Sequence, residues 1–538
     1  MRATADGLFV SIPLKSSNKR ICCRPIQTNL KMKAMKLLKA LLVTFLVLSA
    51  GITPKSSVAR ELDRKAVDRI GTLTKVWGLM KYYHPGVAAG SINWDSVFVA
   101  YVPKVTEAKD QQEFDRLMDE LYAQLPAPKL TASYNLPKAD SIVAVFSGGE
   151  IAAYRVSPAL RQQLKDLYER HLPVESRYIT DKYKEYTLDH VRFLENPMAE
   201  VAYPNRETRL LALARYWNTI NFFYPHKQSI GKSWERVLQR YVPVFADAAN
   251  ELEYHLAIQR LNKEIVDSHS FVSSPTINAM WGPNPHFLVG YIENKFIVTR
   301  LQSDSLAKAE DIRVGDVILS INGKPVKQRA RELWPLMMGS NKIATYRDVA
   351  NYLINIDSKS FATLEIQRNG TRLTKKVSRY PYQQLVKLSD TPTQQDAWRE
   401  VDAGVYWVDF AEIKDTTKLA DLFTDLKQAS TVIMDLRKYP NFWVYRHTLP
   451  ALFPDSFHVS NTTNGLVNFP GLFTQSKSML ERTGTSKLLP YTGRMIVLVN
   501  EHTQSLGESF AFGLAQRPNT IIMGSQTAGT TGNITWLP

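Results

Sequence analysis

The sequence is poor in the residues that mark several common protein classes. Only two of its 538 residues are cysteine, Cys22 and Cys23, so disulfides cannot stabilise the rest of the chain. No group of histidine, cysteine and carboxylate residues has metal-ligand spacing, and no phosphate-binding glycine loop or dinucleotide fingerprint occurs. We therefore expect neither a metal nor a cofactor.

The sequence also lacks a concentrated basic surface, although its formal net charge is +16. Residues 1–59 hold ten Lys and Arg and one Asp, which leaves 57 basic and 50 acidic residues, a formal +7, spread along the remainder. A nucleic-acid partner is therefore not indicated.

Long apolar runs are scarce as well. The run LLVTFLVLSA follows four lysines between Lys31 and Lys39 and precedes Ser57-Val58-Ala59, small residues that suit a signal-peptidase site. It is too short to span a bilayer comfortably, which makes a membrane anchor the weaker alternative. We expect residues 1–59 to be a leader and signal peptide, with translation starting at Met1, Met32 or Met35. The mature protein is then exported, periplasmic or extracellular, with no stable membrane span.

A duplication follows the leader. RIGTLTKVWGLMKYYHP from Arg69 and RLLALARYWNTINFFYP from Arg209 align without gaps, and Trp77 and Trp94 recur as Trp217 and Trp234 at an offset of 140. Two copies of one helical unit are predicted. Residues 60–205 then hold the first copy, a small α/β segment and a linker, and residues 206–280 hold the second copy.

Residues 281–385 change to short strands with one helix. IRVGDVILSINGKPV, Ile312 to Val326, resembles the most recognisable stretch of PDZ domains, with a tight turn at Asn322-Gly323. An unrelated hairpin is the alternative. PDZ domains add an extended peptide, commonly a free C-terminus, to a sheet edge. We assign peptide contacts here to Gly290 and Tyr291.

Residues 398–538 alternate apolar strands with helices, which predicts a largely parallel sheet. Ligands of such sheets bind beyond the carboxyl ends of the strands, where Asn441, Ser505 and Thr527 fall. Overall the fold is expected to be multidomain, α+β and α/β: a duplicated helical region, a PDZ-like β domain and a βαβ core.

Ser505 lies between the apolar segment VLVN and a helical pattern. A serine at such a junction exposes its hydroxyl, and the next amide, that of Leu506, points to where an oxyanion would form. The turn lacks the first glycine of the G-x-S-x-G elbow, and Glu508 makes Ser505 equally compatible with a capping box. The local residues leave both interpretations open.

The second helical copy ends in Asp267-Ser268-His269-Ser270, which the first copy lacks. A histidine can act as a general base near neutral pH, although a lone histidine at a helix end is usually a satisfied polar residue. Asp267 lies only two residues before this histidine, so we expect it to be poorly placed to orient the imidazole ring.

Taken together, DSHS, the PDZ-like segment, DLR at a strand end, NEHTQSLGESFAFGL and GSQTAGTTGNIT resemble the tail-specific (C-terminal-processing) and tricorn-type serine peptidases. The resemblance implies a crotonase-like core with Ser505 as nucleophile. Thr530 stands where the processing proteases carry a lysine base, which excludes a Ser/Lys dyad. The tricorn-like style instead makes His269 the base, with Ser268 orienting the relay.

The resemblance also implies backbone oxyanion donors at Leu506 and Asn441, and substrate contacts at Thr527 and Gly529. It further implies an acidic relay residue and additional strands downstream of Pro538, so we expect the core to be C-terminally truncated. The resulting hypothesis is an exported serine endopeptidase acting on polypeptides. Its alternatives are an inert PDZ-type peptide-binding protein and an esterase or acyl transferase on a related scaffold.

Overall fold

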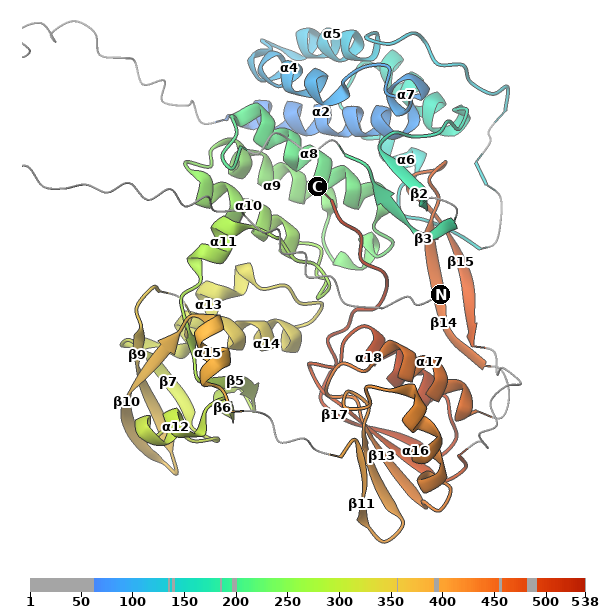
Figure 1. The fold of residues 1–538 in the computed structure, drawn as a ribbon. Helices are drawn as coiled ribbons and strands as arrows, with labels where there is room; N and C mark the ends of the chain where they lie inside the picture. Colours follow the sequence, from blue (N-terminus) through green and yellow to red (C-terminus); the bar gives the residue numbers. More distant parts are fainter. Residues whose placement is uncertain are drawn as a thin grey trace, which may run out of the picture. The chain divides into compact units, whose positions relative to one another are not determined.

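The computed structural model describes residues 62–133, 136–137, 141–183, 186–195, 201–355, 357–390, 396–453, 457–480 and 491–537 (Figure 1). The predicted signal peptide and both cysteines lie outside these ranges. Within them, no helix has the length and apolar character needed to cross a membrane.

The helical region contains both copies of the duplicated unit. The first copy comprises α2 (Arg64–Tyr83), α3 (Pro85–Ala88), α4 (Trp94–Glu107) and α5 (Gln111–Tyr122). The second comprises α8 (Arg206–Phe223), η1 (Lys227–Ile230), α9 (Trp234–Ala246) and α10 (Glu251–Lys263), followed by α11 (Pro275–Met280).

An interlocked pair of tryptophans holds each copy together. In the first, the indole N–H of Trp77 donates to the carbonyl of Trp94 at 2.8 Å, and that of Trp94 donates to the carbonyl of Trp77 at 3.0 Å. Trp217 and Trp234 repeat the arrangement at 2.9 and 3.0 Å. All four side chains are buried, so each indole N–H depends on the partner carbonyl for its hydrogen bond.

The two copies contact each other at equivalent positions. Gly78 and Asn218 are related by the offset of 140, and the Asn218 amide donates to the carbonyl of Thr74 at 3.0 Å. A Cβ on Gly78 would lie 2.0 Å from Asn218 Oδ1. Only glycine therefore allows α2 to approach α8 this closely.

The segment between the copies is more ordered than a linker. It contains β1 (Ile142–Ala144), α6 (Gly148–Ala152), α7 (Pro158–Arg170) and an antiparallel hairpin of β2 (Ile179–Tyr183) and β3 (Tyr186–Phe193). The linker that we expected within residues 60–205 thus contains a hairpin, which the sequence did not predict because its polar, Tyr-rich strands carry little alternation of apolar residues.

The PDZ region forms a sheet in the order β4-β10-β9-β7-β6-β5, with β8 paired to β7. Its strands are β4 (Asn284–Pro285), β5 (Phe287–Ile292), β6 (Lys295–Leu301), β7 (Val317–Ile321), β8 (Lys324–Pro325), β9 (Phe361–Arg368) and β10 (Thr371–Tyr380). Its helices are α12 (Asp304–Glu310), α13 (Val326–Leu333), η2 (Trp334–Leu336), α14 (Lys342–Tyr352) and α15 (Tyr382–Leu388). Asn322 and Gly323 have φ of 49° and 77°, as a type I′ hairpin turn requires.

The C-terminal sheet is largely parallel, as predicted. Its order is β11-β12-β13-β16-β17, in which only the pairing of β11 (Trp398–Asp402) with β12 (Val405–Asp409) is antiparallel. The other strands are β13 (Thr431–Asp435), β16 (Arg494–Val499) and β17 (Thr520–Gly524). The crossovers contain η3 (Thr416–Lys418) with α16 (Leu419–Leu426), α17 (Phe442–Ala451) and α18 (Leu506–Ala515).

One crossover carries a hairpin that the sequence did not predict. β14 (Phe457–Gly465) and β15 (Leu472–Leu480) form a three-stranded sheet with β1, which lies more than 300 residues earlier. The hairpin turn also contacts the helical region, since Gly471 N–H donates to the carbonyl of Phe222 at 2.8 Å. Figure 1 shows this hairpin beside β2 and β3.

The contribution of the tryptophan pairs to the stability of the helical region can be tested by substitution. We expect Trp77→Phe to lower the stability of the helical region by about 1–3 kcal/mol, because it removes the buried indole hydrogen bond to Trp94 and leaves space beside a smaller ring. The thermal midpoint followed by far-UV circular dichroism should fall by at least about 2 °C. Trp443→Phe is the matched control, since that side chain is 52% exposed. Equal midpoints for the two variants would contradict the interpretation.

Candidate active site

Ser505 occupies the junction between β16 and α18. Its backbone has φ 56° and ψ −113°, a combination that L residues rarely adopt and that surrounding structure must enforce. The turn before it is fixed by buried Thr503, whose hydroxyl accepts the N–H of Asn500 at 3.0 Å and donates to the carbonyl of Leu436 at 2.8 Å. The turn is thereby tied to the end of β13.

Two helix N-termini meet at this edge of the sheet. Leu506 opens α18, so its amide has no intrahelical acceptor, and neighbouring Gly507 packs against Pro440 before α17. Asn441 caps α17, its side chain accepting the N–H of Trp443 at 2.9 Å. Free amides and aligned helix dipoles favour negative charge here. The sequence alone located both residues at this edge.

Both carboxylate oxygens of Glu508 accept hydrogen bonds from groups around Ser505. Oε2 accepts the N–H of Ser505 at 3.0 Å and that of Thr530 at 2.9 Å. Oε1 accepts the N–H of Gly529 and the hydroxyl of Thr527, each at 2.6 Å. The glutamate is thus more than a helix cap, because it joins the serine turn to the turn after β17.

His269 lies in the loop that follows α10. The loop turns sharply at Val266, whose φ of 56° is a true outlier for a β-branched residue. Asp267 Oδ1 then accepts the N–H of His269 at 2.9 Å, and the Asp267 carbonyl accepts the hydroxyl of Ser270 at 2.7 Å. These bonds fix the loop in which the histidine is presented.

Thr530 connects the histidine with the serine. Its hydroxyl lies 2.5 Å from Asp267 Oδ1 and 3.0 Å from His269 Nδ1, and its carbonyl accepts the N–H of Ser505 at 3.0 Å. Three chain segments that are distant in sequence therefore meet at one threonine. As expected, Asp267 makes no direct hydrogen bond to the imidazole among the described residues. It reaches the ring only through this hydroxyl, a route that sequence reasoning missed.

Ser268 makes its hydrogen bonds away from the imidazole. Its hydroxyl donates to the carbonyl of Ala528 at 3.1 Å and accepts the N–H of Ser340 at 2.8 Å, while its own N–H donates to the Ser340 hydroxyl at 2.9 Å. These contacts join the histidine loop to the PDZ region. The predicted orienting role of Ser268 stays a prediction that these bonds do not favour.

Of the predicted substrate contacts, those at Thr527 and Gly529 adjoin the serine. The Thr527 carbonyl accepts the amide of Asn341 at 2.8 Å, and Gly529 has φ 75°, so both residues also shape the turn. Gly290 and Tyr291 lie on β5, in a narrow cleft that also contains Glu501 and His502 from the serine turn. Tyr291 stacks on Tyr346 of α14 at 3.8 Å between ring centroids.

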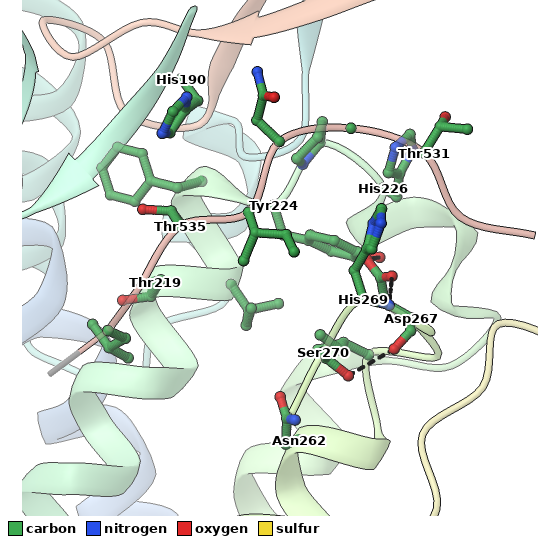
Figure 2. Close-up of a pocket in the computed structure, with 18 of the residues that line it drawn as sticks. His190, Thr219, Tyr224, His226, Asn262, Asp267, His269, Ser270, Thr531 and Thr535 are labelled. Carbon is green, nitrogen blue, oxygen red and sulfur yellow. Dashed lines mark hydrogen bonds between the residues drawn. The ribbon is translucent and has the colours of Figure 1, made fainter. Parts of the chain in front are cut away.

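A pocket of about 1380 Å³ adjoins the site. It reaches the site at Asp267, His269 and Glu508, and Figure 2 shows Asp267, His269 and Tyr224 close together in its lining. Much of the lining is apolar and aromatic: Tyr216, Phe223, Tyr224, Phe245, Tyr254, Ile258, Leu261, Phe271, Phe512 and Trp536. Such a surface accommodates apolar side chains of a ligand.

Two segments of the chain match family models. Residues 286–389 match the PDZ domain, and residues 459–537 match peptidase family S41. No curated protein matches the sequence.

Several solved structures are similar to the chain at low sequence identity. One is mature CPAF complexed with lactacystin, 13% identical over 60% of this chain and 85% of that chain, with a TM-score of 0.44. The photosystem II D1 C-terminal processing protease is 16% identical over 60% and 82% of the two chains, with a TM-score of 0.33. The tricorn protease is 14% identical over 63% and 32%, with a TM-score of 0.27.

The sequence resemblance to tail-specific and tricorn-type enzymes rested on the serine turn, the T-x-G turn and the PDZ-like stretch. The family models match regions that contain these same features. The chain thus combines a segment similar to PDZ domains with a segment similar to the serine peptidases of family S41.

Proposed function

We propose that the protein is an exported endopeptidase that cleaves polypeptides through an acyl-enzyme on Ser505, with His269 as general base. The observation that carries the proposal is the convergence on Thr530, which contacts His269 Nδ1 through its hydroxyl and the Ser505 N–H through its carbonyl. The proposed export rests on the basic and apolar leader ending at Ala59.

In this mechanism Ser505 Oγ attacks the scissile carbonyl while His269 Nε2 takes its proton. The tetrahedral oxyanion is stabilised by the N–H of Leu506 and by a backbone N–H of the turn that ends at Asn441. Collapse expels the amine, which is protonated by His269, and water then hydrolyses the acyl-enzyme. We further propose a crotonase-like core with additional strands C-terminal to β17.

The strained backbone of Ser505 depends on Glu508 in this proposal. A carboxylate only accepts hydrogen bonds, and all four groups that face Glu508 are donors. Charge-assisted bonds of this kind contribute about 1.5–3 kcal/mol each, comparable to the roughly 1–3 kcal/mol cost of the Ser505 conformation. Glu508 is therefore proposed as the group that keeps the nucleophile in place.

The PDZ region is proposed to bind the C-terminal end of a polypeptide along β5. Among the described strands β5 is the last in its sheet, and α14 packs beside it. An extended peptide can add to such an edge through backbone hydrogen bonds. The cleft at Gly290 and Tyr291 opens next to the serine turn, so the bound end would lie near the peptidase site.

The nucleophile is tested by labelling with a fluorophosphonate probe and intact-mass analysis. The parent chain should gain one adduct, and Ser505→Ala and His269→Ala should each abolish it, because both the hydroxyl and its base are required. The parent should also cleave an unfolded polypeptide. A parent chain that stays unlabelled would favour the inert peptide-binding alternative. A labelled chain that turns over small esters but no polypeptide would favour the esterase.

Glu508→Gln tests the proposed support of the nucleophile. The side-chain NH₂ of glutamine would face hydrogen-bond donors, so the turn of residues 527–530 should open more often. Its backbone amide hydrogens should then exchange with solvent at least about tenfold faster, which corresponds to a loss of about 1.4 kcal/mol in the free energy of opening. Hydrogen exchange with mass spectrometry measures this. Glu501→Gln is the control, since the Glu501 carboxylate accepts the exposed hydroxyl of Ser525, which precedes that turn. Unchanged exchange in Glu508→Gln would contradict the assigned role.

The PDZ proposal is tested with two fluorescein-labelled peptides of one sequence, one with a free C-terminal carboxylate and one amidated. Fluorescence anisotropy on Ser505→Ala, which prevents cleavage, should give a Kd at least about tenfold lower for the carboxylate, because the amide loses charge-assisted hydrogen bonds. Equal Kd values would show that no free C-terminus is recognised.

A further inference from the structure

We propose that Thr530 is a positioning residue that couples the charge of Asp267 to the imidazole of His269 and thereby supplies the acidic arm of the relay. This inference rests on the proposed function of Ser505 and His269. Residues 530 and 267 are separated by 263 positions, yet Thr530 Oγ1 is 2.5 Å from Asp267 Oδ1 and 3.0 Å from His269 Nδ1.

The direction of the two hydrogen bonds follows from donor and acceptor chemistry. A carboxylate can only accept, so the single hydroxyl proton of Thr530 goes to Asp267. The hydroxyl oxygen then has only lone pairs for His269, and Nδ1 must carry the proton that it donates. This fixes the tautomer in which Nε2 bears the free lone pair, the form that a base acting on Ser505 requires.

Thr530 is held so that its hydroxyl has little freedom. Its N–H donates to Glu508 Oε2 at 2.9 Å, its carbonyl accepts the N–H of Ser505 at 3.0 Å, and its surface is 9% exposed. The backbone bonds place the relay hydroxyl in a fixed relation to the nucleophile. A mobile surface threonine would not have this property.

Asp267 is held from two sides as well. Its Oδ1 also accepts the N–H of His269, and its Oδ2 accepts the phenol of Tyr224 at 3.2 Å. Burial, assisted by the negative charge of Asp267, raises the pKa of Tyr224 above its ordinary value, so the phenol remains a donor. The carboxylate is thus oriented toward Thr530 and not merely near it.

The consequence concerns the step in which His269 becomes positively charged. When Nε2 takes the serine proton, the imidazolium hydrogen-bonds through Nδ1–H to a hydroxyl polarised by the Asp267 carboxylate. Among the described residues, this stabilisation involves no direct contact between a carboxylate and the imidazole. The serine O–H breaks and its proton binds Nε2, while Oγ bonds to the scissile carbon and the carbonyl π bond opens to the oxyanion. The relay of Thr530 and Asp267 itself transfers no proton.

The test compares Thr530→Val, which keeps the shape but removes the hydroxyl, with Thr530→Ser, which keeps the hydroxyl. On a polypeptide substrate we expect Thr530→Val to lower kcat by about 10- to 100-fold with KM little changed, and Thr530→Ser to stay within about threefold of the parent. Asp267→Asn should lower kcat similarly. The double variant Asp267→Asn with Thr530→Val should have a kcat no lower than that of the worse single variant, because both changes interrupt the same series of hydrogen bonds.

Parental kcat in Thr530→Val, or losses that multiply in the double variant, would overturn the relay. Failure of Thr530→Ser to recover activity would also overturn it, because the role assigned is that of the hydroxyl alone. Thermal midpoints of all variants show whether a loss is one of folding. If Thr530→Val does not fold, Tyr224→Phe is the substitute, with an expected drop in kcat of about threefold and the same thermal midpoint.

A second measurement does not require activity. In Ser505→Ala labelled with ¹⁵N-histidine, the ring nitrogens of His269, assigned with His269→Gln, should show the Nδ1–H tautomer, and Thr530→Val should shift the ring toward a mixture of tautomers. An Nε2–H tautomer would overturn the relay. If the parent chain is not labelled by the fluorophosphonate probe but His269 shows the Nδ1–H tautomer, the proposed function is refuted. The hydrogen bonds from Asp267 through Thr530 to His269 then have a structural role only.

Discussion

The geometry of the candidate site depends on the carboxylate of Glu508 and the four donors that converge on it. Two of them belong to the backbone of Ser505 and Thr530, whose positions no local preference would select. Ser505 is a non-glycine residue at positive φ, and Thr530 lies in an irregular segment after β17. Because one carboxylate binds both, the positions of the proposed nucleophile and of the proposed relay hydroxyl cannot vary independently.

The histidine loop is joined to this arrangement from the opposite side by the PDZ region. Ser340 exchanges two hydrogen bonds with Ser268, and neighbouring Asn341 donates to the carbonyl of Thr527 at 2.8 Å. Arg347, on α14, donates to the carbonyl of Glu501 at 2.8 Å. Helix α14 and the two residues before it thus contact the histidine loop, the T-x-G turn and the serine turn. The helix that borders the proposed peptide cleft is therefore part of the framework that holds the site together.

The parts of the fold that sequence predicted are those whose causes are local. The apolar strands around Ser505, the Asn322-Gly323 turn and the two copies of the helical unit each follow from spacing or from one residue's conformational preference. The β14–β15 hairpin escaped prediction because its strands are polar and its third strand, β1, lies in the helical region. Glu508 could be recognised only as a helix cap, since three of its four partners lie 19 to 22 residues away. Thr530 and His269 are separated by 261 residues, so no pattern in the sequence links them.

The residue at position 530 is chemically suited to the proposed histidine base. A lysine there would place an ammonium group between Asp267 and His269, where it would neutralise the carboxylate and oppose a second positive charge on the ring. It would also be a donor only, and could not accept from Nδ1–H. Threonine donates to one neighbour and accepts from the other, and it carries no charge. In the proposed mechanism, a threonine at position 530 thus suits His269 as the base, and a lysine at the same position would oppose it.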